Sequence, residues 1–85
     1  PTQLFIGLVK AYDASTQMAT IEQRNYFEVN SDVEILAVDG SVKAFHLEEM
    51  TDEDGLETKI ARHPKQILKI KVPFPVKPYE MLRKL

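Results

Sequence analysis

Residues 33–45 read VEILAVDGSVKAF, two runs rich in Val, Ile and Phe on either side of an Asp39-Gly40 pair. An Asp-Gly pair between two such runs is typical of a β-hairpin, because both central residues of a type I′ turn need a positive φ angle. The stretch therefore predicts two antiparallel strands, residues 33–38 and 41–50, joined by a type I′ turn.

Four further apolar runs flank this hairpin, at residues 4–12, 18–23, 56–61 and 66–72. Short runs rich in Val, Ile, Leu and Phe between turn-forming residues are typical of strands rather than helices. In the last run Leu68 and Ile70 share one face and Lys69 and Lys71 the other. We therefore expect an all-β fold, a small antiparallel β-barrel of about six strands, closed or nearly closed because closure protects strand edges.

Two further glycines predict local backbone geometry. Gly7 interrupts a strand that is otherwise apolar on both faces, which indicates a β-bulge or a close approach of two backbones. Asp54-Gly55 repeats the hairpin signal before residues 56–61.

The last part of the chain is punctuated by proline. Residues 73–78, PFPVKP, hold three prolines, which remove backbone donors and fix φ, so we expect an extended strap across the barrel. The side chains that would pin the strap are Phe74, Val76 and Tyr79. Residues 79–85 are too few for an independent helix and predict a final edge strand or a single turn.

Length and composition indicate one small domain. The chain has 85 residues and no cysteine, and no apolar run approaches the length of a bilayer-spanning helix. We expect a cytoplasmic location, because no signal sequence begins the chain and no disulfide framework exists. The chain opens at Pro1 instead of a methionine, and we expect it to be a piece of a longer protein.

Charge is divided unevenly along the chain. Residues 1–58 hold three basic residues against twelve acids, whereas residues 59–85 hold eight basic residues against Glu80 alone. The basic side chains could follow a phosphate backbone, with Phe74 or Tyr79 available for stacking. The competing interpretation is that they pair with the acidic half of the domain or with an acidic partner domain, and it is favoured because opposed charges in one small domain tend to neutralise each other. The candidate binding residues are Lys65, Lys69, Lys71, Lys77, Arg83 and Lys84.

No catalytic constellation is evident. Ser15, Ser31 and Ser41 lack a nucleophile-elbow context and are predicted to be turn residues. The three glycines stand apart, so neither a GxGxxG motif nor a phosphate loop is present. The sequence therefore predicts no catalytic residue in this chain.

The metal-site signals are weak. His46 and Glu48 lie two apart, with Glu49 or His63 as further ligands, but no zinc-type spacing accompanies them. Residues 50–61 resemble a calcium loop only in part, because Met50 and Ala61 would occupy positions that need oxygen ligands. We expect no metal and no cofactor in this domain.

Three segments carry a resemblance to a known family. They are Glu22-Gln23-Arg24-Asn25 with Phe27, the turn of residues 52–55 followed by His63-Pro64, and the closing residues 77–84, KPYEMLRK. With them, nearly the whole chain resembles the C-terminal domain of the U-32 peptidase family, the collagenase-like proteases of bacteria and archaea. One departure is Ser31-Asp32, where members usually carry Gly-Asp, and it affects turn geometry alone.

The resemblance implies a barrel similar to the second domain of elongation factor Tu, attached behind a larger catalytic domain. Family proteins are catalogued as peptidases, and some resemble tRNA or rRNA hydroxylation factors whose cysteines hold an iron-sulfur cluster. Because this chain has no cysteine, the catalytic apparatus is expected outside it. The motif residues Glu22, Gln23, Arg24, Asn25 and Phe27 are expected to be structural. For Arg24 the sequence favours a guanidinium bonded to loop carbonyls, and a ligand contact is the alternative.

We therefore expect a non-catalytic accessory domain of a U-32 protein. In one hypothesis it assists substrate binding, with RNA as the ligand. In the alternative it is a structural module that docks on the catalytic domain of the same polypeptide or forms a homodimer. Binding of a protein or peptide substrate through a strand edge rests on the family's name alone.

Overall fold

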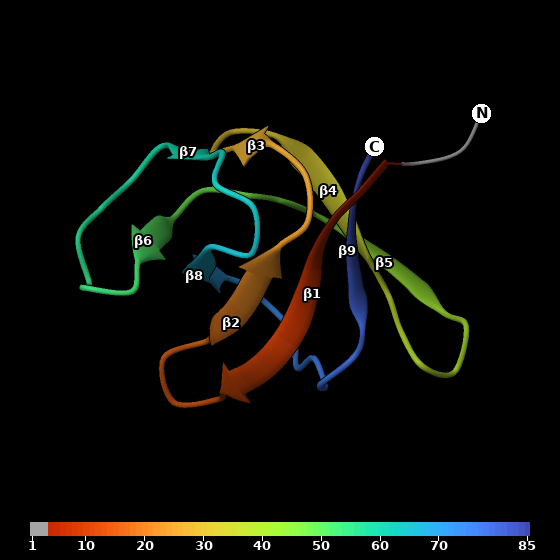
Figure 1. Ribbon diagram of the computed structural model, residues 1–85. Helices are drawn as coiled ribbons and strands as arrows, with labels where there is room; N and C mark the ends of the chain where they lie inside the picture. The colour runs from red at the N-terminus through yellow and green to blue at the C-terminus, as the bar shows by residue number, and fades with distance from the viewer. Residues whose placement is uncertain (1–3) are drawn as a thin grey trace.

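The computed structural model describes residues 4–85, in which nine β-strands and no helix are present (Figure 1). The strands are β1 (Leu4–Asp13), β2 (Met18–Gln23), β3 (Phe27–Glu28), β4 (Asp32–Leu36), β5 (Val42–His46), β6 (Met50–Asp52), β7 (Ile60–Ala61), β8 (Ile67–Lys71) and β9 (Met81–Lys84). Pro1 lies outside the described residues. No helix of residues 4–85 has the length and hydropathy needed to cross a bilayer.

Seven strands form one antiparallel sheet in the order β5-β4-β9-β1-β2-β8-β6, and β3 pairs separately with β7. The sheet is curled into a half-barrel, and the short β3–β7 pair lies at the top of the view in Figure 1. The predicted all-β, antiparallel, barrel-like class is confirmed. The barrel is not closed, because the edge strands β5 and β6 do not pair with each other.

The core lies on the inner face of the curled sheet and follows the predicted alternation. Leu68, Ile70 and Val72 are fully buried, while Lys69 between them is exposed. Burial of such an apolar side chain contributes roughly 1.5–3 kcal/mol, so the inward face of β8 is a main source of stability. The buried apolar side chains of the other strands are Ile6, Val9, Ala19, Ile21, Phe27, Val33, Ile35, Met50, Ala61 and Leu82, joined by Leu47 and Val76 from the connections.

The β4–β5 hairpin is present, but its turn differs from the prediction. The Gly40 N–H donates to the Ala37 carbonyl and the Ala37 N–H donates to the Ser41 carbonyl, and Gly40 has φ of 89°. Asp39 is not among the residues with positive φ, so the type I′ prediction is wrong. The loop is a type I turn followed by a left-handed glycine, a form common in three-residue hairpins. The Asp39 carboxylate stabilises it by accepting hydrogen bonds from the Ser41 N–H and hydroxyl.

The strand predicted at residues 56–61 is divided in two. Gly55 turns the chain with φ of 81°, and Glu57 makes a single bridge with Thr51. The chain then leaves the sheet, and Ile60–Ala61 pairs with Phe27–Glu28. Phe27 and Ala61 are both buried, so burial of these two side chains favours the separate pair over a continuous hairpin.

Gly7 lies at the bulge that its position predicts. The pairing of β1 with β9 shifts register between Phe5 and Gly7. A Cβ atom on Gly7 would lie 2.5 Å from Cγ2 of Ile21, so the Ile21 side chain fills the space that a side chain at this position would need.

The C-terminal segment is central, and the prediction of an edge strand or single turn is wrong. β9 lies between β1 and β4 and pairs with both. Leu82 on β9 is fully buried, and this burial draws the strand into the sheet. In the strap, Val76 is buried and Phe74 is half-buried, whereas Tyr79 is 74% exposed and does not pin it.

Candidate binding surfaces

Lys69 and Lys71 lie together on the outer face of β8. Lys69 is exposed and sits opposite Thr20 on β2 and Thr51 on β6. The Lys71 Nζ donates a hydrogen bond to the carbonyl of Thr16 at 3.0 Å, which holds this ammonium beside the β1–β2 turn. The two side chains form the β8 lysine pair, two positive charges with partly fixed geometry.

A groove of about 350 Å³ lies beside Lys69 and is lined by both polar and apolar side chains. The Asp13 carboxylate also lines it. The Ser15 hydroxyl, followed by the Ser15 N–H, lowers the pKa of Asp13, so this acid stays charged near neutral pH. An anion in the groove would therefore sit toward the lysine and threonine side. The lining residues are Ala11, Tyr12, Asp13, Thr16, Met18, Thr20, Thr51 and Lys69.

The remaining candidate basic residues are spread over separate parts of the surface. Lys65 precedes β8, and its N–H donates to the Gln23 carbonyl. Lys84 ends β9, which β1 and β2 separate from β8, on the order of 14 Å across the sheet. The six basic residues therefore do not form one continuous stripe.

Arg83 is committed to an internal partner. Its Nη2 lies 2.8 Å from Oε1 of Glu34, and the Glu34 side chain is 8% exposed. The contact is an ion pair and not a hydrogen bond. Neither Oε1 of Glu34 nor Nε of Arg83 has a hydrogen-bond partner among residues 4–85. This charge is thus largely neutralised within the sheet.

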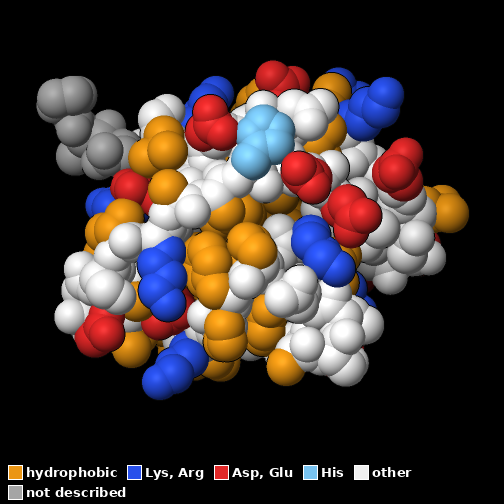
Figure 2. Space-filling model, turned by 180° about the vertical axis from the view of Figure 1, so that it is seen from behind, with side chains coloured by type: hydrophobic (Ala, Val, Ile, Leu, Met, Phe, Trp, Pro, Cys, Tyr) orange, Lys and Arg blue, Asp and Glu red, His pale blue; other side chains and the backbone are white. Residues whose placement is uncertain are grey.

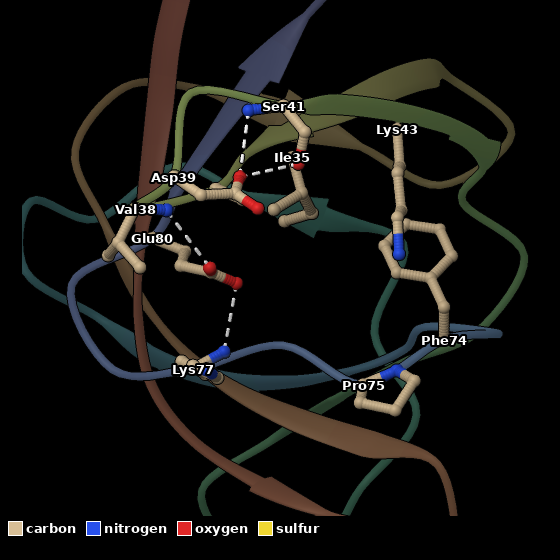
Figure 3. Close-up of a pocket in the computed structure, with 10 residues that line it drawn as sticks. Ile35, Val38, Asp39, Ser41, Lys43, Phe74, Pro75, Lys77 and Glu80 are labelled. Carbon is tan, nitrogen blue, oxygen red and sulfur yellow. Dashed lines mark hydrogen bonds between the residues drawn. The ribbon is translucent and has the colours of Figure 1, made fainter.

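Lys77 lines a different cavity, of about 200 Å³, between the β4–β5 hairpin and the strap (Figure 3). The Lys43 Nζ lies 5.3 Å from the centre of the Phe74 ring. The Phe74 ring meets Phe45 edge-on, with centroids 5.6 Å apart and planes at 87°. Sequence reasoning missed Lys43, because it lies in the acidic half of the chain; its alternation with Phe45 on one strand face was the available signal.

Glu80 lines this cavity and lies between Val38 and Lys77, as Figure 3 shows. Its carboxylate accepts hydrogen bonds from the Lys77 N–H at 2.9 Å and the Val38 N–H at 3.1 Å. Because the residue is only 5% exposed and both oxygens are engaged, the carboxylate fixes the strap to the hairpin rather than serving as an acid or base.

Gln23 and Phe27 of the sequence motif lie inside the fold. The Gln23 Nε2 donates to the carbonyl of Ala61 at 3.1 Å, and the Gln23 N–H donates to the carbonyl of Gln66. Phe27 is 1% exposed in the core. These contacts join β2 to β7 and to the start of β8.

The other motif residues lie at the end of β2. The Arg24 guanidinium lies 5.2 Å from the centre of the Phe5 ring and 3.9 Å from Oε1 of Glu22, a different arrangement from the expected bonds to loop carbonyls. The Asn25 Nδ2 donates to the Phe5 carbonyl at 2.7 Å. The backbone N–H groups of Arg24 and Asn25 both donate to the carbonyl of Ile6, so the turn after β2 is held against β1.

The serines and histidines lie in structural settings. Each serine hydroxyl donates to a nearby acceptor in its own turn, so the turn-serine prediction is confirmed; the acceptors are the Asp13 and Asp39 carboxylates and the Glu28 carbonyl. The His46 Nδ1 lies 2.9 Å from Oδ1 of Asp32. Across residues 4–85, no three His, Cys, Asp or Glu side chains are grouped so that they could hold a metal ion.

The face opposite to that in Figure 1 combines apolar and charged side chains. Figure 2 shows hydrophobic side chains gathered near its centre, with basic side chains on both sides and acidic ones above them and to the right. Neither charge dominates this face, in agreement with the formal net charge of -2.

Three comparisons relate the chain to known proteins. The family model described as peptidase family U32 C-terminal domain matches residues 1–83. The tRNA hydroxylation protein P1 of Bacillus subtilis (strain 168) is 42% identical over 80 residues. That match covers 94% of this chain and 19% of the Bacillus protein, so the chain spans about a fifth of that relative.

The fold is also similar to two solved structures. One is described as the "C-terminal domain of Geobacillus thermoleovorans putative U32 peptidase", with a TM-score of 0.90 and 44% identity over 96% of this chain and 92% of that one. The other is its selenomethionine variant, with a TM-score of 0.89 and 45% identity over 94% of this chain and 98% of that one.

Proposed function

Because this chain belongs to the peptidase family U32 C-terminal domain family, we propose that it is a non-catalytic accessory domain that helps a longer U32 protein hold its substrate. The substrate in this proposal is RNA, and tRNA is the first to test, because one relative is described as a tRNA hydroxylation protein. The chemistry of the parent protein, whether peptide hydrolysis or RNA hydroxylation, is assigned to residues outside this chain, and the site of action to the cytoplasm.

The observation that carries the proposal is the β8 lysine pair. Lys69 is exposed and lines a groove together with Thr16, Thr20 and Thr51, and the Lys71 ammonium is positioned by its bond to the Thr16 carbonyl. Two ammonium groups on one strand face can contact successive phosphates of a backbone. The hydroxyls of Thr20 and Thr51 flank Lys69 and add donors of the kind that contact phosphate and sugar.

A fluorescence-anisotropy titration of the domain with bulk tRNA at low and moderate salt tests this. The wild type should bind, and affinity should fall steeply as salt rises. Lys69→Glu with Lys71→Glu should abolish binding at moderate salt and lower the magnitude of the salt slope by about 1.4–1.8, the value for two lost phosphate contacts. The matched control, Lys43→Glu with Lys59→Glu, changes net charge equally and should retain most of the affinity. Absent binding at low salt, or equal losses in both variants, would contradict the proposal.

A second candidate function is docking on the catalytic domain of the same polypeptide. Val38 is 66% exposed and Tyr79 is 74% exposed, and Glu80 links their segments. Large apolar side chains this exposed on one end of a small domain are typical of contact surfaces. In the parent protein, Val38→Ser with Tyr79→Ser should lower the melting temperature, whereas the isolated domain should change little.

A further inference from the structure

β5 is an edge strand with one whole side of its backbone free. Within residues 4–85 its neighbour in the sheet is β4 alone. In an antiparallel ladder, hydrogen-bonded residue pairs alternate with pairs that share no hydrogen bond. The Ala37 N–H donates to the Ser41 carbonyl and the Leu47 N–H donates to the Ser31 carbonyl, so these two pairs are of the hydrogen-bonded kind and set the order between them. The residues in between whose N–H and C=O point away from β4 are therefore Val42, Ala44 and His46.

The opposite edge of the sheet is covered, which makes the open edge at β5 distinctive. On the outer side of β6, the Asp52 N–H donates to the Leu56 carbonyl and the Thr58 N–H donates to the Met50 carbonyl. The segment after the Asp54-Gly55 turn thus occupies the free side of β6. No segment of residues 4–85 does the same for β5.

β5 has few of the features that protect natural edge strands. It has no proline, and its register with β4 is continuous from Val42 to His46, without a bulge. The one protective feature is Lys43, an inward-pointing charge whose Nζ lies over the Phe74 ring. Val42 is 47% exposed and Ala44 is exposed, so the open edge of β5 faces solvent at the right of Figure 1.

We propose that β5 of one copy pairs antiparallel with β5 of a second copy of this chain. A two-fold axis at Ala44 places Ala44 opposite Ala44 of the second copy and Val42 opposite His46. All the outward residues then face one another, and each pair exchanges both of its N–H···O bonds. On the inner face Lys43 comes opposite Phe45 of the second copy, which permits a cation–π contact and places no like charges together. The strand is thus complementary to itself, as a two-fold interface requires.

This dimer does not depend on RNA binding, and single cysteines test it directly. The chain has no native cysteine, so each variant carries one thiol. In the proposed register the two Ala44 Cα atoms are about 5.5 Å apart, within disulfide range, whereas Val42 lies opposite His46 and far from its own copy. Under mild oxidation Ala44→Cys should become mostly disulfide-linked dimer and Val42→Cys should stay monomeric. Equal cross-linking of both, or none at Ala44→Cys, would overturn the proposal.

Light scattering provides the second measurement. The wild type should reach twice the 9.7 kDa monomer mass as concentration rises. Ala44→Pro removes an outward N–H that β4 does not use, so the variant should keep its circular dichroism spectrum and become monomeric. Its matched control, Ala44→Ser, keeps the N–H and should remain dimeric. A wild type that stays monomeric across the series, or a folded Ala44→Pro dimer, would refute pairing at this edge.

Discussion

The carboxylate of Glu80 accepts a hydrogen bond from the backbone N–H of Val38 at 3.1 Å, across 42 residues of sequence. Val38 is in the turn of the β4–β5 hairpin, and Glu80 directly precedes β9. Its other oxygen accepts the Lys77 N–H, so one side chain ties the hairpin turn to the strap. The geometry of the cavity in Figure 3 depends on this contact.

Glu80→Ala should lower the free energy of unfolding by about 2–4 kcal/mol, because two partly buried N–H groups lose a charged acceptor. Glu80→Gln keeps one acceptor oxygen and should lose about half as much. Chemical denaturation monitored by circular dichroism measures both. Glu53→Gln, in an exposed turn, is the control and should stay within about 0.5 kcal/mol of the wild type.

The pKa of Asp39 should depend on Ser41. The Ser41 hydroxyl, followed by the Ser41 N–H, lowers the pKa of Asp39. Ser41→Ala removes the hydroxyl contact and keeps the N–H contact, so the pKa of Asp39 should rise part of the way to its ordinary value. Because the folded-state pKa is the lower one, the stabilisation is present above the unfolded-state pKa and is lost as pH falls through the folded one.

An NMR titration of the side-chain carboxyl carbons measures this directly. The chain contains its own control, since Ser15 lowers the pKa of Asp13 through the same two contacts. Ser15→Ala should shift Asp13 and leave Asp39 unchanged, and Ser41→Ala should do the reverse. A shift of both acids in either variant would point to a general change in fold instead of a local bond.

The sequence predicts local features better than it predicts the position of strands in the sheet. Lys69 and Lys71 occupy the outer face of β8 as the alternation requires, and Gly7 lies at a bulge in the pairing of β1 with β9. The central position of β9 depends on the burial of Leu82 between β1 and β4, partners far away in the sequence. Such long-range pairing leaves little local signal, and the shortness of residues 79–85 alone suggested an edge strand or a single turn.

In the candidate site, too, local features were predictable from the sequence and long-range contacts were not. The neighbouring pair Lys69 and Lys71 was predictable from spacing. The neutralisation of Arg83 by Glu34 was not, because β4 and β9 meet only in the folded sheet. Lys43 was missed because it lies in the acidic half of the chain. Its alternation with Phe45 was a local signal, but its contact with Phe74 on the strap was not predictable from spacing.

Gly7→Ala should destabilise the domain by about 1–3 kcal/mol, since the new methyl would overlap Cγ2 of Ile21. The Ile21→Ala background removes that methyl, and the cost of Gly7→Ala should shrink there. Thermal unfolding of the four proteins of the double-mutant cycle gives the coupling. If the two changes are additive, steric overlap with Ile21 is not the cause.

Glu34→Ala should cost about 2 kcal/mol and leave tRNA binding unchanged after correction for stability. The value is below the roughly 3–5 kcal/mol of a fully buried pair, because the Arg83 side chain keeps 22% exposure. The exposed pair of His46 and Asp32 is the control, and Asp32→Ala should cost about 1 kcal/mol or less. Urea denaturation ranks the two, and a larger loss for Asp32→Ala would contradict the assignment.

Tyr79→Gly should stabilise the isolated domain by about 1 kcal/mol. Tyr79 has φ of 73°, a left-handed conformation that costs a side-chain-bearing residue roughly 1–2 kcal/mol and glycine almost nothing. Its ring is 74% exposed, so little packing is lost. Tyr79→Ala keeps the conformational cost and should change the melting temperature little, which separates backbone strain from loss of the ring.

In the parent protein both variants should weaken domain docking, because a strained, exposed tyrosine is expected where a side chain serves a contact outside its own domain. Equal stability of Tyr79→Gly and Tyr79→Ala in the isolated domain would show that the positive φ carries no cost there.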